Sequence, residues 1–295
     1  MRNMIAKSLL LLLFLSATCA AQSLPVKWEE LTAPDFVKAL EQAKGTCILP
    51  FGILEKHGPA GPLGTDLINV RYGTLQAVKQ EYAIVFPEYY FGQIFEARQQ
   101  PGTIAYSSHL QLELLRETTS EMARNGCTKI LIINGHGGNT NLLQYFAQSQ
   151  LDSPKDYVIY VWLGSNQPTG PAAAQAAAPS RSGVDGHAGE NEISNVLASR
   201  PDLAHPERSS SQSGADAHGL NLPNGLYTGI WWYAKFPNHY QGDASGATAA
   251  RGEALTRIRV EGIVSAIRAV KSDEAALRLQ KEFFEKAKHP LDTKQ

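Results

Sequence analysis

The chain has 295 residues, of which 43% are hydrophobic and 19% are charged. A chain of this length and composition can bury the core of one sizeable α/β domain. Its 27 basic and 28 acidic residues nearly cancel, which argues against nucleic acid or a membrane surface as the partner and favours a small, local substrate.

The first 21 residues have the pattern of an export signal. Basic residues precede an apolar run at 9–15 that is too short to span a bilayer, and small residues follow it. We expect cleavage after Ala20 or Ala21 and an exported, periplasmic protein. Lipid attachment at Cys19 is the alternative. The mature chain, 22–295, is expected to form a single domain that makes no membrane contact.

Cleavage leaves two cysteines, Cys47 and Cys127, each at the start of a predicted buried strand. Two cysteines do not make a disulfide framework. We interpret them as small buried apolar residues. A single disulfide, formed in an oxidising compartment, is the alternative.

Short apolar runs alternate with segments of helical spacing along the mature chain. The runs predict strands at 46–52, 83–92, 128–134 and 156–164. The spacing and start signals predict helices at 32–44, 67–81, 109–126, 139–151 and 190–199, and one or two more within 248–285. Polar or Gly/Pro-rich connections are expected at 93–108, 165–185 and 201–247. This alternation predicts a three-layer αβα sandwich with a mostly parallel central sheet, in which ligands gather at the carboxyl ends of the strands.

The stretch 49–66, LPFGILEKHGPAGPLGTD, places Glu55, His57 and Asp66 just after the first strand. Glu55 and His57 are two residues apart, so in an extended segment both side chains lie on one face. The Gly/Pro-rich loop can then return Asp66 to the same point. Carboxylates and imidazoles suit zinc, manganese or iron, and Asp66 could bridge two ions about 3.5–4 Å apart. The alternative is a set of exposed loop residues, with Asp66 capping a helix.

The stretch 134–139, NGHGGN, follows another predicted strand and adds His136. Its glycines let the backbone approach a metal or ligand closely. Asn134 and Asn139 could fix the loop or bind substrate. A phosphate-binding loop competes with this interpretation, but the Lys-Ser/Thr pair of such loops is missing. A plain strand-to-helix turn is the other alternative.

The segment GHAGENE opens a predicted helix, in which His187 and Glu190 are neighbours on one face. We predict that His187 handles a proton, that Glu190 is a metal ligand and that Glu192 takes part in acid–base chemistry. The two glutamates could exchange these roles. The alternative is a charged helix start that suits the helix dipole.

Aromatic residues at 231–233 could stack on a planar substrate or lie at a subunit contact. From them we choose Trp231, together with Asn139, as predicted substrate contacts. The other histidines stand alone and are expected to be structural or exposed, although FPNHYQGD could form a loop at the site; they are His109, His205, His218 and His239.

In order and spacing, these motifs resemble the creatininase (creatinine amidohydrolase) family over roughly residues 47–270. The resemblance rests on PFGILEKHGPAGPLGTD, PGTIAYS, NGHGGN, HAGENEIS and GDASGATAARG. It implies a three-layer α/β fold, two divalent ions (zinc and/or manganese, with iron as an alternative), hydrolysis of a cyclic or linear amide, and often a hexamer. Carried over by motif, His187 looks like the histidine near the substrate. Four residues look like metal ligands: Glu55, His57, Asp66 (bridging) and His136.

The chain departs from the family pattern at a few positions. Gly138 stands where creatininases have an acidic residue, and Lys56 and Ala60–Gly61 replace commoner residues. Glu190 could complete the centre instead. We therefore expect an exported amidohydrolase that cleaves a C–N bond of a small amide by metal-activated water. The alternatives are a hydrolase of a lactone or phosphoester, and a non-catalytic periplasmic protein that binds a metal or ligand.

Overall fold

The computed structural model describes residues 24–164, 180 and 183–294. The predicted export signal, its cleavage site and most of the stretch 165–185 lie outside the described residues. Within the described part of the chain, no helix combines the length and the apolar composition that a bilayer crossing requires.

A sheet of four strands, all paired in parallel, forms the centre of the molecule. In sheet order the strands are β2 (Ile84–Val85), β1 (Thr46–Phe51), β3 (Lys129–Asn134) and β4 (Val158–Trp162). Every residue of β1 is buried, as an unbroken apolar run in a parallel sheet predicts. The strand predicted at 83–92 is wrong beyond β2. Pro87 has no N–H to donate, and Tyr89 returns only for an isolated bridge to Phe51.

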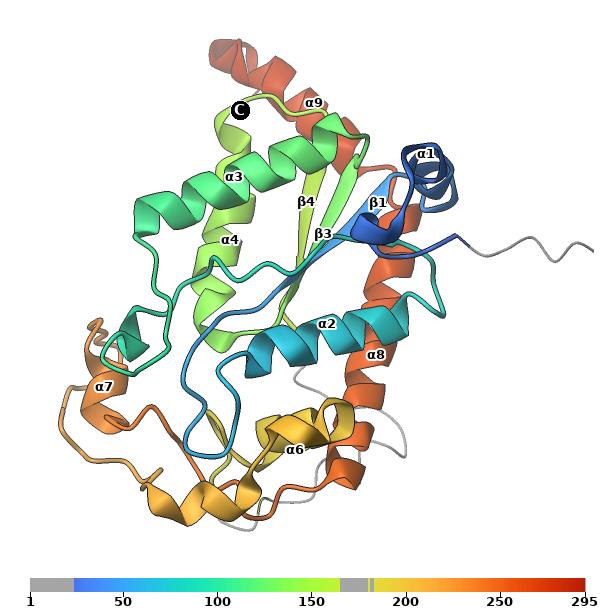
Figure 1. Cartoon of the computed structure of the whole chain (residues 1–295). Helices are drawn as coiled ribbons and strands as arrows, with labels where there is room; N and C mark the ends of the chain where they lie inside the picture. The colour runs from blue at the N-terminus through green and yellow to red at the C-terminus, as the bar shows by residue number, and fades with distance from the viewer. Residues whose placement is uncertain (1–23, 165–179, 181–182, 295) are drawn as a thin grey trace, which may run out of the picture.

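Helices cover both faces of this sheet, which confirms the three-layer αβα architecture (Figure 1). One face carries α1 (Ala33–Gln42), α3 (Ser108–Arg124) and α4 (Thr140–Ser149), and the other carries α2 (Thr65–Ala77) and α8 (Ala249–Ser272). The helix α6 (Glu190–Ser199) packs on α2 and α8. The other α-helices of the described residues are α7 (Trp231–Lys235) and α9 (Ala276–Ala287). The segment 248–285 thus holds two helices, α8 and most of α9.

Side-chain caps mark several helix starts. The hydroxyl of Thr32 accepts a hydrogen bond from the first turn of α1, and Ser107 and Thr248 do the same for α3 and α8. Such caps satisfy backbone N–H groups that have no partner inside the helix.

Alternate residues of the strands enter different cores. Leu49 of β1 packs with Leu115 of α3 and Phe146 of α4, whereas its neighbour Ile48 packs with residues of α2 and α8, including Ile263. This alternation follows from the period of two in a strand.

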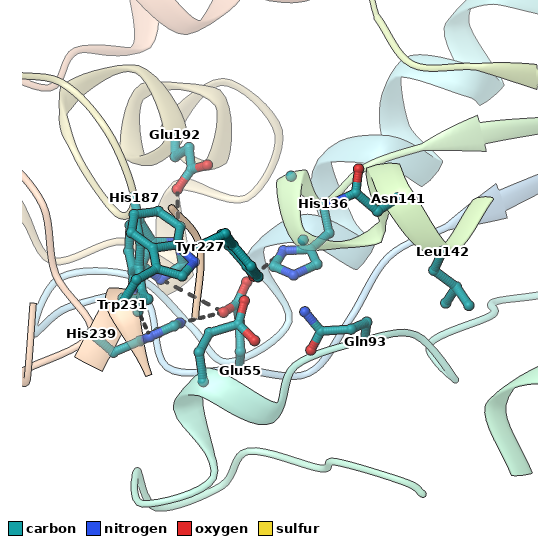
Figure 2. Close-up of a pocket in the computed structure, with 14 residues that line it drawn as sticks. Glu55, Gln93, His136, Asn141, Leu142, His187, Glu192, Tyr227, Trp231 and His239 are labelled. Carbon is teal, nitrogen blue, oxygen red and sulfur yellow. Dashed lines mark hydrogen bonds and ion pairs between the residues drawn. The ribbon is translucent and has the colours of Figure 1, made fainter. Parts of the chain in front are cut away.

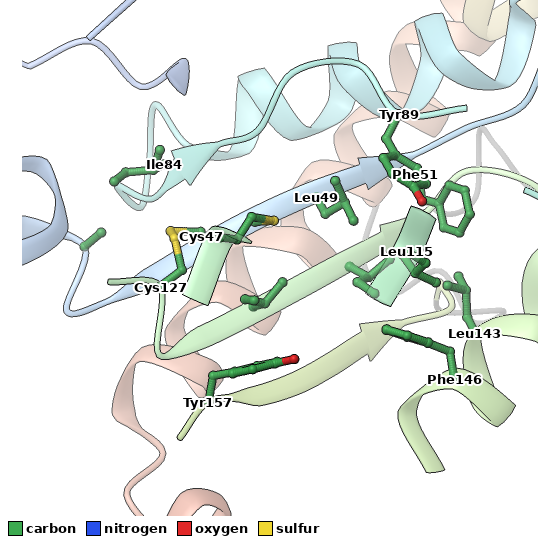
Figure 3. Packing of buried hydrophobic residues seen from close by; sticks show 14 of the residues in the cluster. Cys47, Leu49, Phe51, Ile84, Tyr89, Leu115, Cys127, Leu143, Phe146 and Tyr157 are labelled. Carbon is green, nitrogen blue, oxygen red and sulfur yellow. A yellow bond between two sulfur atoms is a disulfide. The ribbon is translucent and has the colours of Figure 1, made fainter. Parts of the chain in front are cut away.

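Cys47 and Cys127 form a disulfide at the start of β1 (Figure 3). Both residues are fully buried. Their interpretation as two separate apolar residues is therefore wrong, and the alternative, a single disulfide, is what the structure contains. The bond ties the first strand to the segment that leads into β3.

Strands β1 and β3 end at the same edge of the sheet, because Phe51 pairs with Asn134. The loops that follow these strands therefore leave from one rim. Helix α6 reaches this rim by packing closely on α8. At Gly252 of α8 a Cβ atom would lie only 1.8 Å from the carbonyl oxygen of Ser194, so the approach requires glycine.

Candidate metal centre

The loop between β1 and α2 folds back on itself. The backbone N–H of Glu55 donates to the carbonyl of Leu63 across the loop at 3.0 Å. Gly58 has φ +53°, and a Cβ atom there would lie 2.8 Å from an aromatic ring, so this turn requires glycine. The fold-back brings Asp66, in the first turn of α2, beside Glu55 and His57, and all three side chains are buried.

A first cluster comprises Glu55, Asp66 and His136. Nδ1 of His136 lies 2.8 Å from Oε1 of Glu55 and 2.9 Å from Oδ2 of Asp66. His136 comes from the end of β3 and the two carboxylates from the loop and helix after β1. The structure thus brings together side chains that the sequence analysis expected at one rim.

A second cluster comprises His57, Asp66 and Glu192. Nε2 of His57 lies 3.3 Å from Oδ1 of Asp66 and 3.7 Å from Oε2 of Glu192. Asp66 therefore presents one oxygen to each cluster, which is the geometry of a bridging carboxylate. Nδ1 of His57 lies 3.3 Å from the carbonyl of Glu55. If it donates there, Nε2 keeps its lone pair for a metal.

The facing atoms of the two clusters are buried without a hydrogen bond; they are Glu55 Oε1, His57 Nε2 and Asp66 Oδ2. Buried polar atoms are normally paired, and buried carboxylates that face one another repel. A divalent cation in each cluster would satisfy these atoms. Carboxylate oxygens and imidazole nitrogens are also the donors that zinc and manganese take, so the residues fit a metal centre.

The pKa shifts in the clusters also show that these carboxylates stabilise positive charge beside them. Burial would lower the pKa of His57, but Asp66, Glu55 and Glu192 together raise it to about 9. Burial would also lower the pKa of His136, but Glu55 and Asp66 raise it well above its ordinary value. The pKa values of Glu55 and Asp66 are lowered in turn, despite burial, by the neighbouring histidines. The carboxylates therefore favour cations beside them.

His187 lies at the edge of both clusters and forms a third possible ligand group with Glu55 and His57. Its Nε2 lies 2.8 Å from the carbonyl oxygen of Lys56. A carbonyl only accepts, so Nε2 carries the hydrogen and Nδ1 keeps its lone pair. Nδ1 lies 3.8 Å from Oε2 of Glu192. Burial lowers the pKa of His187 to about 3, so the ring is neutral near pH 7.

His239 contacts the first cluster from a distant part of the chain, where the sequence analysis expected a structural or exposed residue. The indole Nε1–H of Trp232 donates to Nδ1 of His239 at 2.8 Å. Because that N–H can only donate, Nε2 of His239 carries the hydrogen and donates to Oε2 of Glu55. The signal in the sequence is the segment FPNHYQGD, a possible loop at the site.

The structure differs from the prediction at Glu190. Its carboxylate lies 3.4 Å from the guanidinium of Arg251 and belongs to neither cluster, whereas Glu192 belongs to the second. The prediction treated His187 and Glu190 as neighbours on one helix face, but α6 begins at Glu190, so His187 precedes the helix. Oε2 of Glu192 accepts a bond from the N–H of Ala188 at 2.7 Å, which holds this carboxylate toward His57.

The structure also differs at Asn139, which was predicted to contact substrate. Its side chain is fully buried, and Oδ1 accepts a hydrogen bond from the N–H of Gln93 at 2.9 Å. Asn139 therefore ties the loop after β3 to the loop after β2. The next asparagine, Asn141, lies on the cavity wall instead.

A cavity of about 550 Å³ opens over the first cluster (Figure 2). Its aromatic wall includes Trp231, the predicted substrate contact, together with Trp232 and Tyr227. Gln93 and Asn141 add amide groups on the other side. Glu55, His136, His187, Glu192 and His239 all line this cavity.

Comparison with known proteins agrees with the fold and the motifs. Residues 29–267 match the model of a protein family described as Creatininase: Creatinine amidohydrolase. The mycofactocin precursor peptide peptidase of Mycobacterium ulcerans is 29% identical over 232 residues, which cover 75% of this chain and 83% of that protein.

Solved structures share the fold at low sequence identity. A mutant creatininase of the Zn-Zn type superposes with a TM-score of 0.68 at 21% identity, covering 85% of this chain and 100% of that one. The structure named creatininase Mn superposes with a TM-score of 0.65 at 21% identity, covering 84% and 99% of the respective chains.

Proposed function

The chain belongs to the creatininase family, and from this premise we propose that it is an exported amidohydrolase that cleaves a C–N bond of a small amide with two divalent metal ions. The observation that carries the proposal is the pair of clusters that share Asp66. Each cluster combines carboxylates with one imidazole, and several of their facing atoms are buried without a hydrogen bond.

The residues have distinct places around the proposed ions. Glu55 and His136 would hold one ion, His57 and Glu192 the other, and Asp66 both. Bound there, two divalent ions would supply a water of lowered pKa and would polarise the amide carbonyl. Zinc and manganese, which the names of the similar structures mention, are the candidates.

The protein's own proton carrier in this proposal is His187. Its hydrogen bond to the carbonyl of Lys56 holds the ring in place. The free Nδ1 accepts the proton that the attacking water loses and returns it to the leaving nitrogen. Burial disfavours the protonated ring, so His187 starts the cycle neutral and holds the proton only briefly.

The cavity indicates the kind of substrate. The aromatic wall at Tyr227, Trp231 and Trp232 favours a flat or apolar group, and the amides of Gln93 and Asn141 can bond a polar one. The relative in M. ulcerans is named for a precursor peptide, so short peptides belong among the candidates beside cyclic and linear amides.

Export is supported by two independent features. The first 21 residues have the composition of a signal segment, and the described part of the chain contains a disulfide, which persists in oxidising compartments. Cell fractionation and N-terminal mass analysis test this part of the proposal. A full-length chain recovered from the cytoplasm would contradict it.

The function is tested by metal analysis and a substrate panel. Purified protein should bind about two ions per chain and hydrolyse an amide from a panel of amides, lactones and phosphoesters. His136→Ala should abolish both properties, whereas His109→Ala, at an exposed position on α3, should change neither.

Each other outcome assigns a different function. Less than one ion per chain together with an inert His136→Ala substitution would refute the proposal. Hydrolysis of a lactone or phosphoester alone would make the chain a hydrolase of another bond. Bound metal without turnover of any panel member would favour the non-catalytic metal-binding alternative.

A further inference from the structure

A second cavity, of about 720 Å³, reaches the same clusters from a different side. His136 and Glu192 line it as well as the aromatic cavity. Its walls come from the ends of β3 and β4 and from the helices α6 and α8. The proposed metal centre therefore lies between two spaces, and an elongated substrate bound there could place one half in each.

The two spaces differ in character. The first has the aromatic wall of Tyr227, Trp231 and Trp232. The second is lined by Arg259 and by amides such as Asn195, beside apolar side chains such as Trp162 and Ile258. Arginine lines only the second of these two cavities, which therefore suits an anion better than the first does.

Arg259 lies on α8 and is only partly exposed. Its aliphatic stem lies against α2, where a Cβ atom on Gly73 would be 3.1 Å from Cδ. Its guanidinium makes no hydrogen bond and no ion pair within 4 Å to any described residue. The other partly exposed arginines of the described chain are both paired, Arg71 with Glu29 and Arg251 with Glu190.

A partly buried, unpaired guanidinium is costly unless an anion joins it. The carboxylates of Asp66 and Glu192 act on Arg259 only at a distance. Two divalent ions would more than neutralise the carboxylates of the clusters, so the centre does not need Arg259 to balance its charge. The positive charge is therefore available to a ligand.

We propose that the second cavity binds a carboxylate of the substrate and that Arg259 recognises it. The substrate class is then an amide with a free carboxylate, such as an N-acyl amino acid or the terminal amide bond of a short peptide, with its other half against the aromatic wall. This inference rests on the proposed function. One guanidinium flanked by neutral amides matches a planar, singly charged carboxylate, whereas a phosphate dianion normally requires further positive groups.

The test compares N-acyl amino acids with their carboxamides, which differ only in the charged group. N-benzoylglycine and its carboxamide form the first pair, with N-acetyl amino acids of other side chains as further pairs. Binding to the zinc-loaded protein is measured by calorimetry, and hydrolysis by release of the acyl acid. The wild-type protein should prefer the carboxylates by about 10- to 100-fold, the range for a charge-assisted hydrogen-bonded pair.

Substitutions at Arg259 should change this preference specifically. Arg259→Gln should reduce the ratio to within about threefold, and Arg259→Lys should restore part of it because the charge remains. Arg257→Gln is the matched control, since Arg257 lies exposed on the same helix, and it should leave the ratio unchanged. The metal content of Arg259→Gln should equal that of the wild type.

Several results would overturn the inference. The first is that the wild-type protein binds carboxylates no better than carboxamides. The second is that the preference for carboxylates survives in Arg259→Gln. The third is that Arg259→Gln loses metal, which would place Arg259 beside the metal ligands. Tighter Arg259-dependent binding of phenyl phosphate than of benzoate would reassign the cavity to phosphoryl groups. If no amide is hydrolysed but carboxylates still bind through Arg259, the proposed function fails while the binding site stands.

Discussion

Two consecutive hydrogen bonds, from Trp232 to His239 and from His239 to Glu55, predict that the indole of Trp232 affects metal affinity. Trp232 donates to Nδ1 of His239, and Nε2 of the same ring donates to Oε2 of Glu55. The other oxygen of Glu55 faces His136 in the first cluster. The imidazole thus fixes the orientation of a proposed metal ligand, as groups behind metal ligands commonly do.

Trp232→Phe removes the indole donor but keeps an aromatic ring. The His239 ring then no longer has one preferred tautomer, and Glu55 loses its donor for part of the time. One neutral hydrogen bond contributes about 1 kcal/mol, which corresponds to a roughly fivefold weaker metal affinity. His239→Leu removes the bond to an ionised carboxylate and should cost about 1.5–3 kcal/mol, or roughly 10- to 150-fold.

Metal affinity, measured by competition with a chelator, is the suitable assay, because Trp232 also lines the substrate cavity and activity would mix two effects. Trp231→Phe is the matched control. It changes the neighbouring wall of the same cavity, but the bond to His239 comes from Trp232. Nitrogen-15 NMR of His239 should show Nδ1 without and Nε2 with a hydrogen. A protonated Nδ1, or equal metal affinities in the two tryptophan variants, would refute the reasoning.

Three further predictions follow from the same geometry. A Cβ atom at Gly138 would lie 2.5 Å from Nε2 of His136, whereas one at Gly137 meets nothing within 4 Å. Gly138→Ala should therefore weaken metal binding at least about tenfold, and Gly137→Ala should not. Equal metal affinities of the two variants in chelator titrations would contradict this. In chelated protein at pH 7, the raised pKa values of His57, about 9, and of His136 keep both rings protonated. Metal uptake should therefore release two protons from these rings and part of a third from Glu192, whose pKa burial raises to about 7. Binding should tighten as the pH rises toward about 9, and calorimetry that shows no dependence on the buffer would disprove it. Replacing both cysteines of the disulfide with alanine should lower the free energy of unfolding by roughly 2–4 kcal/mol, because the bond closes a long loop. Denaturant unfolding measures this change, and a reductant should not alter the stability of the double variant.

The features predicted correctly from the sequence are those that depend on local pattern and on sheet geometry. Apolar runs predicted β1 and β3, and parallel pairing makes such strands end at one rim. Glu55 and His136 come together because each lies within a few residues of a strand end. Asp66 follows because the loop before it is short and rich in glycine and proline.

Other features depend on long-range packing or on the phase of a helix. His239 lies 184 positions from Glu55 in the sequence, and no spacing rule connects two such loops. The choice between Glu190 and Glu192 depends on the residue at which α6 begins. A shift of one residue changes which carboxylate faces the cluster, and helix boundaries are the least predictable part of a sequence interpretation.

The position of Glu192 also explains how the centre can form with glycine at 138. A Cβ atom there would crowd His136 and would lie 3.2 Å from Oε1 of Glu96, so this arrangement of His136 leaves no room for a carboxylate at that position. The carboxylate arrives instead from α6, held by the N–H of Ala188. Adding Gly138→Glu to Glu192→Gln should therefore not restore the metal affinity lost in Glu192→Gln alone. Recovery of that affinity in chelator titrations would show that His136 moves aside, and would overturn the steric argument.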